Sequence, residues 1–103
     1  MKTIIWNDIA IRDYHENIDY LLSKWSEKEA VTFINDVESV IFGLKQVNIE
    51  FKESGYLDIR QCVVCKQITL YYKHIGSDTI EILRFWNNYQ DNKKAKTITN
   101  NSL

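Results

Sequence analysis

The side chains most often used for metal or redox chemistry are two cysteines, Cys62 and Cys65, in a C-x-x-C spacing. A zinc site of this kind needs a second cysteine pair or matching histidines, but the sequence offers only His15 and His74. A redox pair needs its first cysteine at a helix N-terminus, where the helix dipole lowers the pKa of the thiol. These cysteines instead lie in a β-branched run, where residues three apart point to opposite faces. We therefore expect two packed free thiols, no bound metal and no cofactor.

Arg84 is the charged residue whose surroundings are most unusual, because it lies within an apolar segment, Thr79–Asn87. Strict alternation along a strand places Arg84 on the same side as Ile82 and Trp86. A guanidinium in that position needs an anion, a carbonyl or an aromatic face nearby. Neither side of the segment is fully polar, which indicates a central strand covered on both faces.

Length and composition indicate one small soluble domain. The chain has 103 residues, of which 45% are hydrophobic and 13% aromatic, with a net charge of −1, and these values exclude a disordered chain. No run approaches the roughly 18 apolar residues of a membrane span. The N-terminus becomes polar too early for the apolar core of a signal peptide. We expect a cytoplasmic protein.

Charge is unevenly distributed along the chain. Residues 1–58 carry 6 Lys/Arg against 11 Asp/Glu, whereas residues 59–103 carry 7 against 3. This division predicts one acidic and one basic surface, of which the basic one suits an anionic or acidic partner. The alternative is that the two surfaces are merely solvated.

The first half of the chain predicts a short strand and two helices. A strand is expected over Lys2–Trp6, and a helix then runs from an N-cap at Asp8 to about Lys24. Apolar residues recur along this helix at spacings of three and four, at Ala10, Tyr14, Ile18, Leu21, Leu22 and Trp25. Its opposite face is polar and carries Arg12, Asp13, Glu16 and Asp19.

The second helix begins at a capping box, Ser26–Glu29, in which each side chain binds a backbone N–H of the first turn. Its apolar positions continue to Leu44. Because about two residues join the helices, they must form an antiparallel hairpin whose tip is Trp25–Ser26.

The second half predicts three consecutive strands. They are expected over Ile59–Val64, Gln67–Ile75 and Thr79–Asn87, with Gly76–Asp78 as a hairpin turn. The element order is β-α-α-β-β-β, and the helical hairpin must bury its apolar stripe against the antiparallel sheet, which makes an α+β domain. Residues 1–96 form the expected domain, and residues 97–103 a flexible tail.

Three motifs in this order resemble the RelE/ParE superfamily of toxins from bacterial type II toxin–antitoxin modules. They are Gly55-Tyr56-Leu57-Asp58-Ile59-Arg60, then Leu70-Tyr71-Tyr72, then Ile82-Leu83-Arg84-Phe85-Trp86-Asn87-Asn88-Tyr89-Gln90-Asp91. Members commonly show Gly…Arg at the second strand, aliphatic-x-Tyr in the third, and Ile-Leu-Arg-x-x-His-x-Arg-x-Asp at the fourth. The resemblance spans about residues 2 to 92 and implies a plasmid-stabilisation type of toxin that inhibits growth.

The resemblance also implies site residues. Arg60 and Arg84 match arginines of the superfamily and are candidate catalytic residues, with Tyr89 as a third. Candidate target-binding residues are Asn87, Lys93 and Lys94. All of these except Asn87 have a structural alternative: Arg60 pairs across the sheet, Arg84 is a core-edge cation, Tyr89 makes a local hydrogen bond, and the lysines belong to a solvated tail.

The resemblance leaves the target open between DNA gyrase and mRNA on the ribosome. Asn87 stands where many members have His, and an amide cannot exchange a proton near neutral pH, so one general acid–base candidate is lost. A pI near 6.1 also fits poorly with a nuclease that works inside a polyanion. We favour ParE-like gyrase inhibition, with an mRNA endoribonuclease and a non-toxic antitoxin-binding remnant as alternatives.

An antitoxin partner is implied as well, because toxins of this superfamily are silenced by a protein segment that wraps around the fold. Four large aromatic residues exceed what a small core readily buries, namely Trp6, Trp25, Phe42 and Phe51. Some of them should line an exposed groove that takes an amphipathic helix or an added strand. The alternative is that they cover the ends of the core.

Overall fold

A computed structural model describes residues 1–46 and 58–89. Six elements follow in the predicted order: β1 Thr3–Trp6, α1 Asp8–Lys24, α2 Glu27–Lys45, β2 Ile59–Cys65, β3 Ile68–Ile75 and β4 Thr79–Asn87. Several predictions lie outside the described residues: the Gly55 motif, Phe51, Lys93, Lys94 and the domain end near residue 96 with its tail. The predicted α+β class and element order are confirmed.

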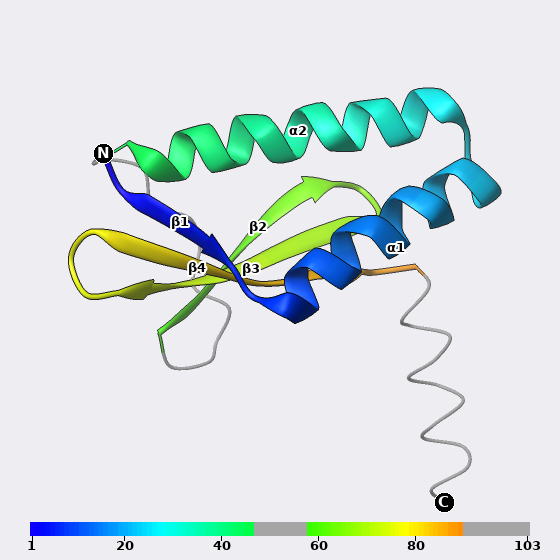
Figure 1. The fold of residues 1–103 in the computed structure, drawn as a ribbon. Coiled ribbons are helices and arrows are strands. Elements are labelled where there is room, and N and C mark those ends of the chain that lie inside the picture. The colour runs from blue at the N-terminus through cyan, green and yellow to red at the C-terminus, as the bar shows by residue number, and fades with distance from the viewer. Residues whose placement is uncertain (47–57, 90–103) are drawn as a thin grey trace, which may run out of the picture.

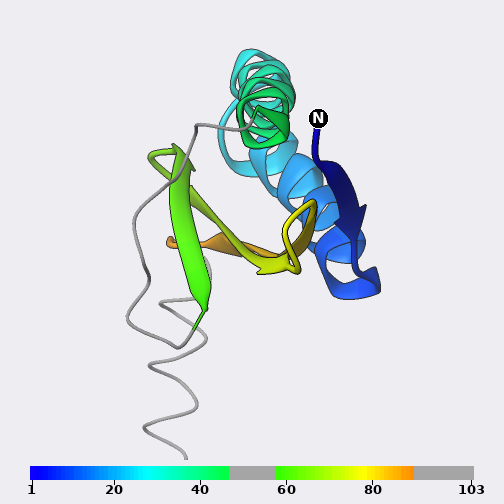
Figure 2. The same ribbon diagram turned by 90° about the vertical axis from the view of Figure 1, so that its left-hand side faces the viewer.

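One mixed sheet carries all four strands, in the order β1-β4-β3-β2. The hairpins β2–β3 and β3–β4 are antiparallel, as predicted, whereas β1 pairs with β4 in parallel, with Thr3 opposite Thr79 and Trp6 opposite Ile82. Both helices lie on the same face of the sheet, with α2 running above it and α1 crossing beside β4 (Figure 1, Figure 2). The other face is called the open face below.

The core lies between the helical hairpin and the sheet. Its members are fully or almost fully buried, and they come from α1 and α2 (Ala10, Leu21, Ala30, Phe33, Val37 and Leu44) and from the strands (Ile68, Leu70, Tyr72, Ile80, Ile82 and Phe85). Burial of these apolar side chains orients the two helices on the sheet.

Both helix starts are capped by side chains. The Oγ of Ser26 accepts from the backbone N–H of Glu29 at 3.2 Å, as the capping box predicts. The first helix is capped by Asn7, not by Asp8, since the Oδ1 of Asn7 accepts from the N–H of Ala10 at 2.8 Å. Asp8 is instead the first helical residue, where its negative charge interacts favourably with the positive end of the helix dipole.

A β-bulge interrupts the alternation of β4. Tyr72 on β3 lies opposite Ile82, but its neighbour Tyr71 lies opposite Arg84, so Leu83 is the extra residue. The expectation that Arg84 shares a face with Ile82 is therefore wrong. Ile82 points to the helices, whereas Arg84 and Trp86 belong to the open face.

Neither helix among the described residues is both long and apolar enough to cross a lipid bilayer.

Candidate functional site

A pocket lies on the open face of the sheet beside the bulge in β4, and the extra residue Leu83 lines it. This open-face pocket has a volume of about 300 Å³ and is lined by Ile59, Tyr71, Leu83, Arg84 and Trp86, which come from β2, β3 and β4. The guanidinium carbon of Arg84 lies 5.1 Å from the centre of the Trp86 ring, within the range of a cation–π contact. The pocket therefore combines one cation with an apolar and aromatic wall.

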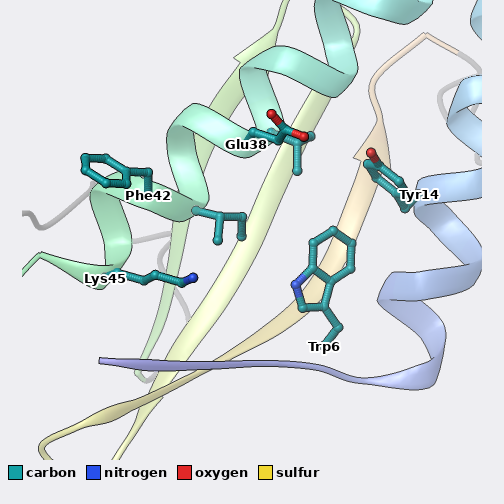
Figure 3. A pocket seen from close by; sticks show the side chains of 7 residues that line it. Trp6, Tyr14, Glu38, Phe42 and Lys45 are labelled. Atoms are coloured by element: carbon teal, nitrogen blue, oxygen red, sulfur yellow. The ribbon is translucent and has the colours of Figure 1, made fainter. Parts of the chain in front are cut away.

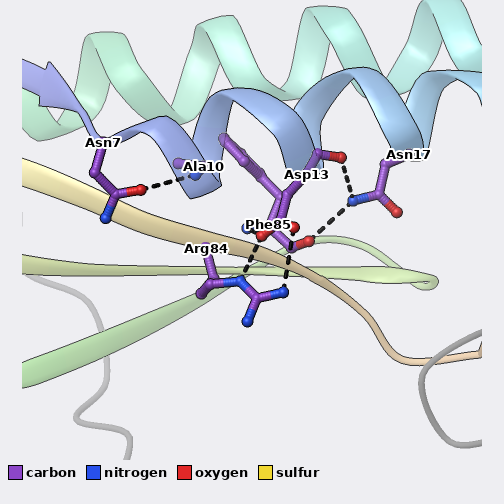
Figure 4. Close-up of polar contacts among 6 residues, drawn as sticks. All are labelled: Asn7, Ala10, Asp13, Asn17, Arg84 and Phe85. Carbon is purple, nitrogen blue, oxygen red and sulfur yellow. Dashed lines mark hydrogen bonds and ion pairs between the residues drawn. The ribbon is translucent and has the colours of Figure 1, made fainter. Parts of the chain in front are cut away.

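Asp13 on α1 holds the Arg84 guanidinium. Its Oδ2 accepts from Nε of Arg84 at 2.6 Å and its Oδ1 from Nη2 at 3.2 Å, which makes a bidentate ion pair (Figure 4). The Asp13 side chain is only 8% exposed, whereas that of Arg84 is 41% exposed. The pair thus joins a buried carboxylate to a cation at the mouth of the pocket.

The same part of α1 completes the hydrogen bonding of β4 beyond the end of β1. The last paired residue of β1 is Trp6, and farther along β4 the Oδ2 of Asp13 accepts from the N–H of Phe85 at 3.1 Å. Nδ2 of Asn17 donates to the carbonyl of Phe85 at 2.9 Å (Figure 4). Two side chains one helical turn apart therefore bind the N–H and the carbonyl of Phe85, as the backbone of a neighbouring strand would.

Asn87, a predicted target-binding residue, belongs to this polar network. It is 3% exposed, and its Nδ2 donates to Oδ1 of Asn17 at 3.0 Å. Its Oδ1 accepts from the backbone N–H of Tyr89 at 3.0 Å. After the bulge, Asn87 points between the sheet and α1, and its amide organises the end of β4. Its predicted role in target binding stays a prediction.

The candidate catalytic residues do not converge. Arg60 is half-buried and lies opposite Tyr72, whereas Arg84 lies opposite Tyr71, so the two arginines belong to opposite faces of the sheet. Tyr89 is 45% exposed, and its ring lies 5.8 Å from that of Trp25, at the tip of the helical hairpin. Of these residues, Arg84 alone lines the open-face pocket.

The two cysteines are free, as predicted, but the stated geometry was wrong. Cys62 lies opposite Leu70 and Cys65 opposite Ile68, because a second bulge between Val63 and Cys65 shifts the register. Both cysteines therefore point to the helix side of β2. Burial raises the pKa of each thiol, which favours the protonated, weakly nucleophilic form. Within the described ranges, no group of three or more potential ligands gathers into a metal site.

A second depression, the helix groove, lies between α2 and the β1–α1 corner. It has a volume of about 500 Å³ and is lined by Trp6, Tyr14, Val37, Glu38, Ile41, Phe42 and Lys45. Figure 3 shows Trp6 and Tyr14 on one wall and the labelled α2 residues on the other. Phe42 is 64% exposed. Burial and, secondarily, the nearby charge of Glu38 raise the pKa of the Tyr14 hydroxyl, which favours its neutral form.

Sequence reasoning missed the two α1 residues that organise the site. The helical period places Asp13 on the polar face, yet it is 6% exposed, and Asn17 is 4% exposed. One signal was available: Asp13 and Asn17 are four residues apart, a spacing that puts both on one face of a helix. Of the two, Asp13 is the anion that Arg84 needs, and Asn17 binds the carbonyl of Phe85 beside it.

The chain was compared with known proteins. No protein-family model and no curated protein matches it. Among solved structures, a chain of the chromosomal ParDE TA system from P. aeruginosa superposes with a TM-score of 0.70 at 19% identity, covering 84% of this chain and 96% of that chain. A copper-bound mutant toxin from Helicobacter pylori superposes with a TM-score of 0.58 at 15% identity, covering 87% and 98%. The chain therefore has a RelE/ParE-like fold, as its motifs predict.

Proposed function

We propose that this protein is the toxin of a type II toxin–antitoxin module and that it acts by binding a macromolecular target through its open face. The observation that carries the proposal is the open-face pocket, in which Arg84 and Trp86 stand together on the fold shared with a ParDE chain. Arginine beside an aromatic ring is the composition typical of energetically dominant positions in protein interfaces. Inhibition of DNA gyrase, as in ParE-like proteins, is the favoured mode.

The chemistry of the pocket favours binding over RNA cleavage. Cleavage needs a base for the ribose hydroxyl, cations for the phosphorane and an acid for the leaving oxygen. The Arg84 guanidinium already faces a carboxylate at 2.6 Å, which offsets the charge that it would offer a phosphate. The described lining has no His, Lys, Asp or Glu. An mRNA endoribonuclease with Arg60, Arg84 and Tyr89 as its catalytic residues is the alternative.

The helix groove is the proposed binding site of the antitoxin. Its exposed Phe42 and half-buried Trp6 are large apolar surfaces of the kind that an amphipathic helix buries. Glu38 and Lys45 lie in the same lining and provide charges of both signs to set the register of such a helix. In this arrangement, the antitoxin and the target bind on opposite faces of the protein.

Induced expression in a bacterial host tests the proposal. Growth arrest accompanied by a DNA-damage response and intact mRNA supports gyrase inhibition. Arrest with cleaved transcripts supports the endoribonuclease. Continued growth at a normal level of folded protein contradicts a toxic function and leaves an antitoxin-binding remnant.

A further inference from the structure

The ion pair between Asp13 on α1 and Arg84 on β4 also restricts the orientation of the Arg84 guanidinium. A guanidinium held by one carboxylate through Nε and one Nη lies in a fixed plane, because two parallel hydrogen bonds remove its freedom to rotate. Asp13 makes both of these bonds to Arg84, at 2.6 Å and 3.2 Å. The third bond to Asp13, from the N–H of Phe85 at 3.1 Å, holds the carboxylate itself in place.

The two partners also differ in their surroundings. The carboxylate is almost fully buried, whereas the Arg84 side chain is 41% exposed and lines the open-face pocket beside Trp86. In the backbone, the extra residue Leu83 turns Arg84 to the open face, although its anion is supplied by a helix that lies on the other face. The Asp13 carboxylate is thus buried inside the protein, and the Arg84 guanidinium is exposed at the pocket.

We infer that Asp13 is a positioning residue for target recognition: it fixes the plane of the Arg84 guanidinium in the open-face pocket. This inference rests on the proposed function, since it assumes that Arg84 meets the target. Asp13 itself is too deeply buried to touch a target, so it acts only through Arg84. A preorganised guanidinium loses less side-chain freedom on binding than a mobile one, and this difference is what Asp13 contributes.

The test compares Asp13→Asn, Arg84→Lys and Asn17→Ala in the full-length protein. Asp13→Asn keeps the volume and an oxygen for the N–H of Phe85 but removes the charged bidentate partner. Arg84→Lys keeps the positive charge and loses the planar fork. Asn17→Ala is the control for the docking of α1, because it removes the bonds to the carbonyl of Phe85 and to Asn87 and keeps both residues of the Arg84–Asp13 pair.

Two quantities are measured for each variant: the amount of folded protein needed to halve colony formation after induction, and the Nε–H signal of Arg84 in arginine-labelled NMR spectra. The expected result is that Asp13→Asn and Arg84→Lys each raise the required amount about tenfold, the equivalent of one strong hydrogen bond. The Arg84 Nε–H should exchange slowly with solvent in the wild type and at least about tenfold faster in Asp13→Asn, as expected when a charge-assisted bond is lost.

Two outcomes of the toxicity assay overturn the inference. One is full toxicity in Asp13→Asn despite fast exchange of the Arg84 Nε–H. The other is an equal loss of toxicity in Asn17→Ala, which would assign the effect to docking of α1 as a whole. A wild-type protein that does not arrest growth defeats the proposed function instead. The NMR comparison then decides whether Asp13 fixes the guanidinium, and identical exchange in wild type and Asp13→Asn overturns that part.

Discussion

Replacement of Asn17 by alanine tests whether α1 completes the hydrogen bonding of β4. The Asn17 amide is 4% exposed; it donates to the carbonyl of Phe85 and accepts from Nδ2 of Asn87. Alanine leaves both groups without these bonds in a buried place, and each loss costs about 1–3 kcal/mol. Asn17→Ala should therefore lower the free energy of unfolding by about 2–4 kcal/mol, since the two losses lie side by side and are not fully additive.

Urea unfolding followed by circular dichroism measures this change, and the melting temperature should fall by roughly 10–20 °C for a domain of this size. Leu22→Ala is the matched control, because Leu22 is on the same helix and 51% exposed, so it should change the free energy by less than about 0.5 kcal/mol. In the double variant Asn17→Ala/Asn87→Ala, the two effects should overlap by about 1 kcal/mol. A loss below about 0.5 kcal/mol for Asn17→Ala alone would refute the reasoning.

Three further predictions concern other parts of the molecule. Phe42→Ala should weaken binding of the cognate antitoxin at least about tenfold in calorimetry without lowering the melting temperature, since Phe42 is 64% exposed; unchanged affinity would exclude the helix groove as the antitoxin site. Gln67→Met should raise the free energy of unfolding by about 1 kcal/mol, because the buried Gln67 amide has no hydrogen-bond partner among the described residues; a loss of stability would contradict this. Labelling of Cys62 and Cys65 by a thiol reagent should be slow at pH 7 in the folded protein. Their raised pKa values keep the thiols protonated at pH 7, so labelling should accelerate only in alkaline solution, where the reactive thiolate forms. The same raised pKa values contribute stability at low pH that is lost as the pH rises through the folded pKa. Rapid labelling at pH 7 would contradict this prediction.

The element order was predictable because its signals are local. The capping box at Ser26–Glu29 marks the start of α2, and the Oγ of Ser26 accepts the expected bond from the N–H of Glu29. The turn at Gly76 separates β3 from β4, and Gly76 has a φ of 67°, a conformation that glycine adopts at little cost. The helical hairpin could bury its apolar stripe only against the sheet, so the α+β class followed from the hydrophobic pattern and the element order.

The arrangement within the sheet was less accessible from sequence. β1 pairs with β4 in parallel, a contact between segments more than 70 residues apart that no local pattern encodes. The bulge at Leu83 also has no signal in a single sequence, since Leu83 fits either face of an apolar strand. That one extra residue moved Arg84 to the open face, and it accounts for the wrong face predicted for Arg84.

The polar network shows the same limit at the level of single residues. The helical period assigned Asp13 to the solvent, because a carboxylate is seldom buried without a partner. Its partners, Arg84 and the N–H of Phe85, are more than 70 positions away in sequence. The need of Arg84 for an anion was recognised from sequence, but the identity of that anion required the fold.

The most direct test of the central claim is the viable count after induction of Trp86→Ala beside the wild type. Trp86 lines the open-face pocket and contacts Arg84, whereas Val31, the matched control, is 48% exposed on α2 and lines neither described pocket. The wild type and Val31→Ala should arrest growth, and Trp86→Ala should restore colony formation at an equal level of folded protein. Arrest by Trp86→Ala as strong as that of the wild type would place the toxic surface elsewhere and contradict the account.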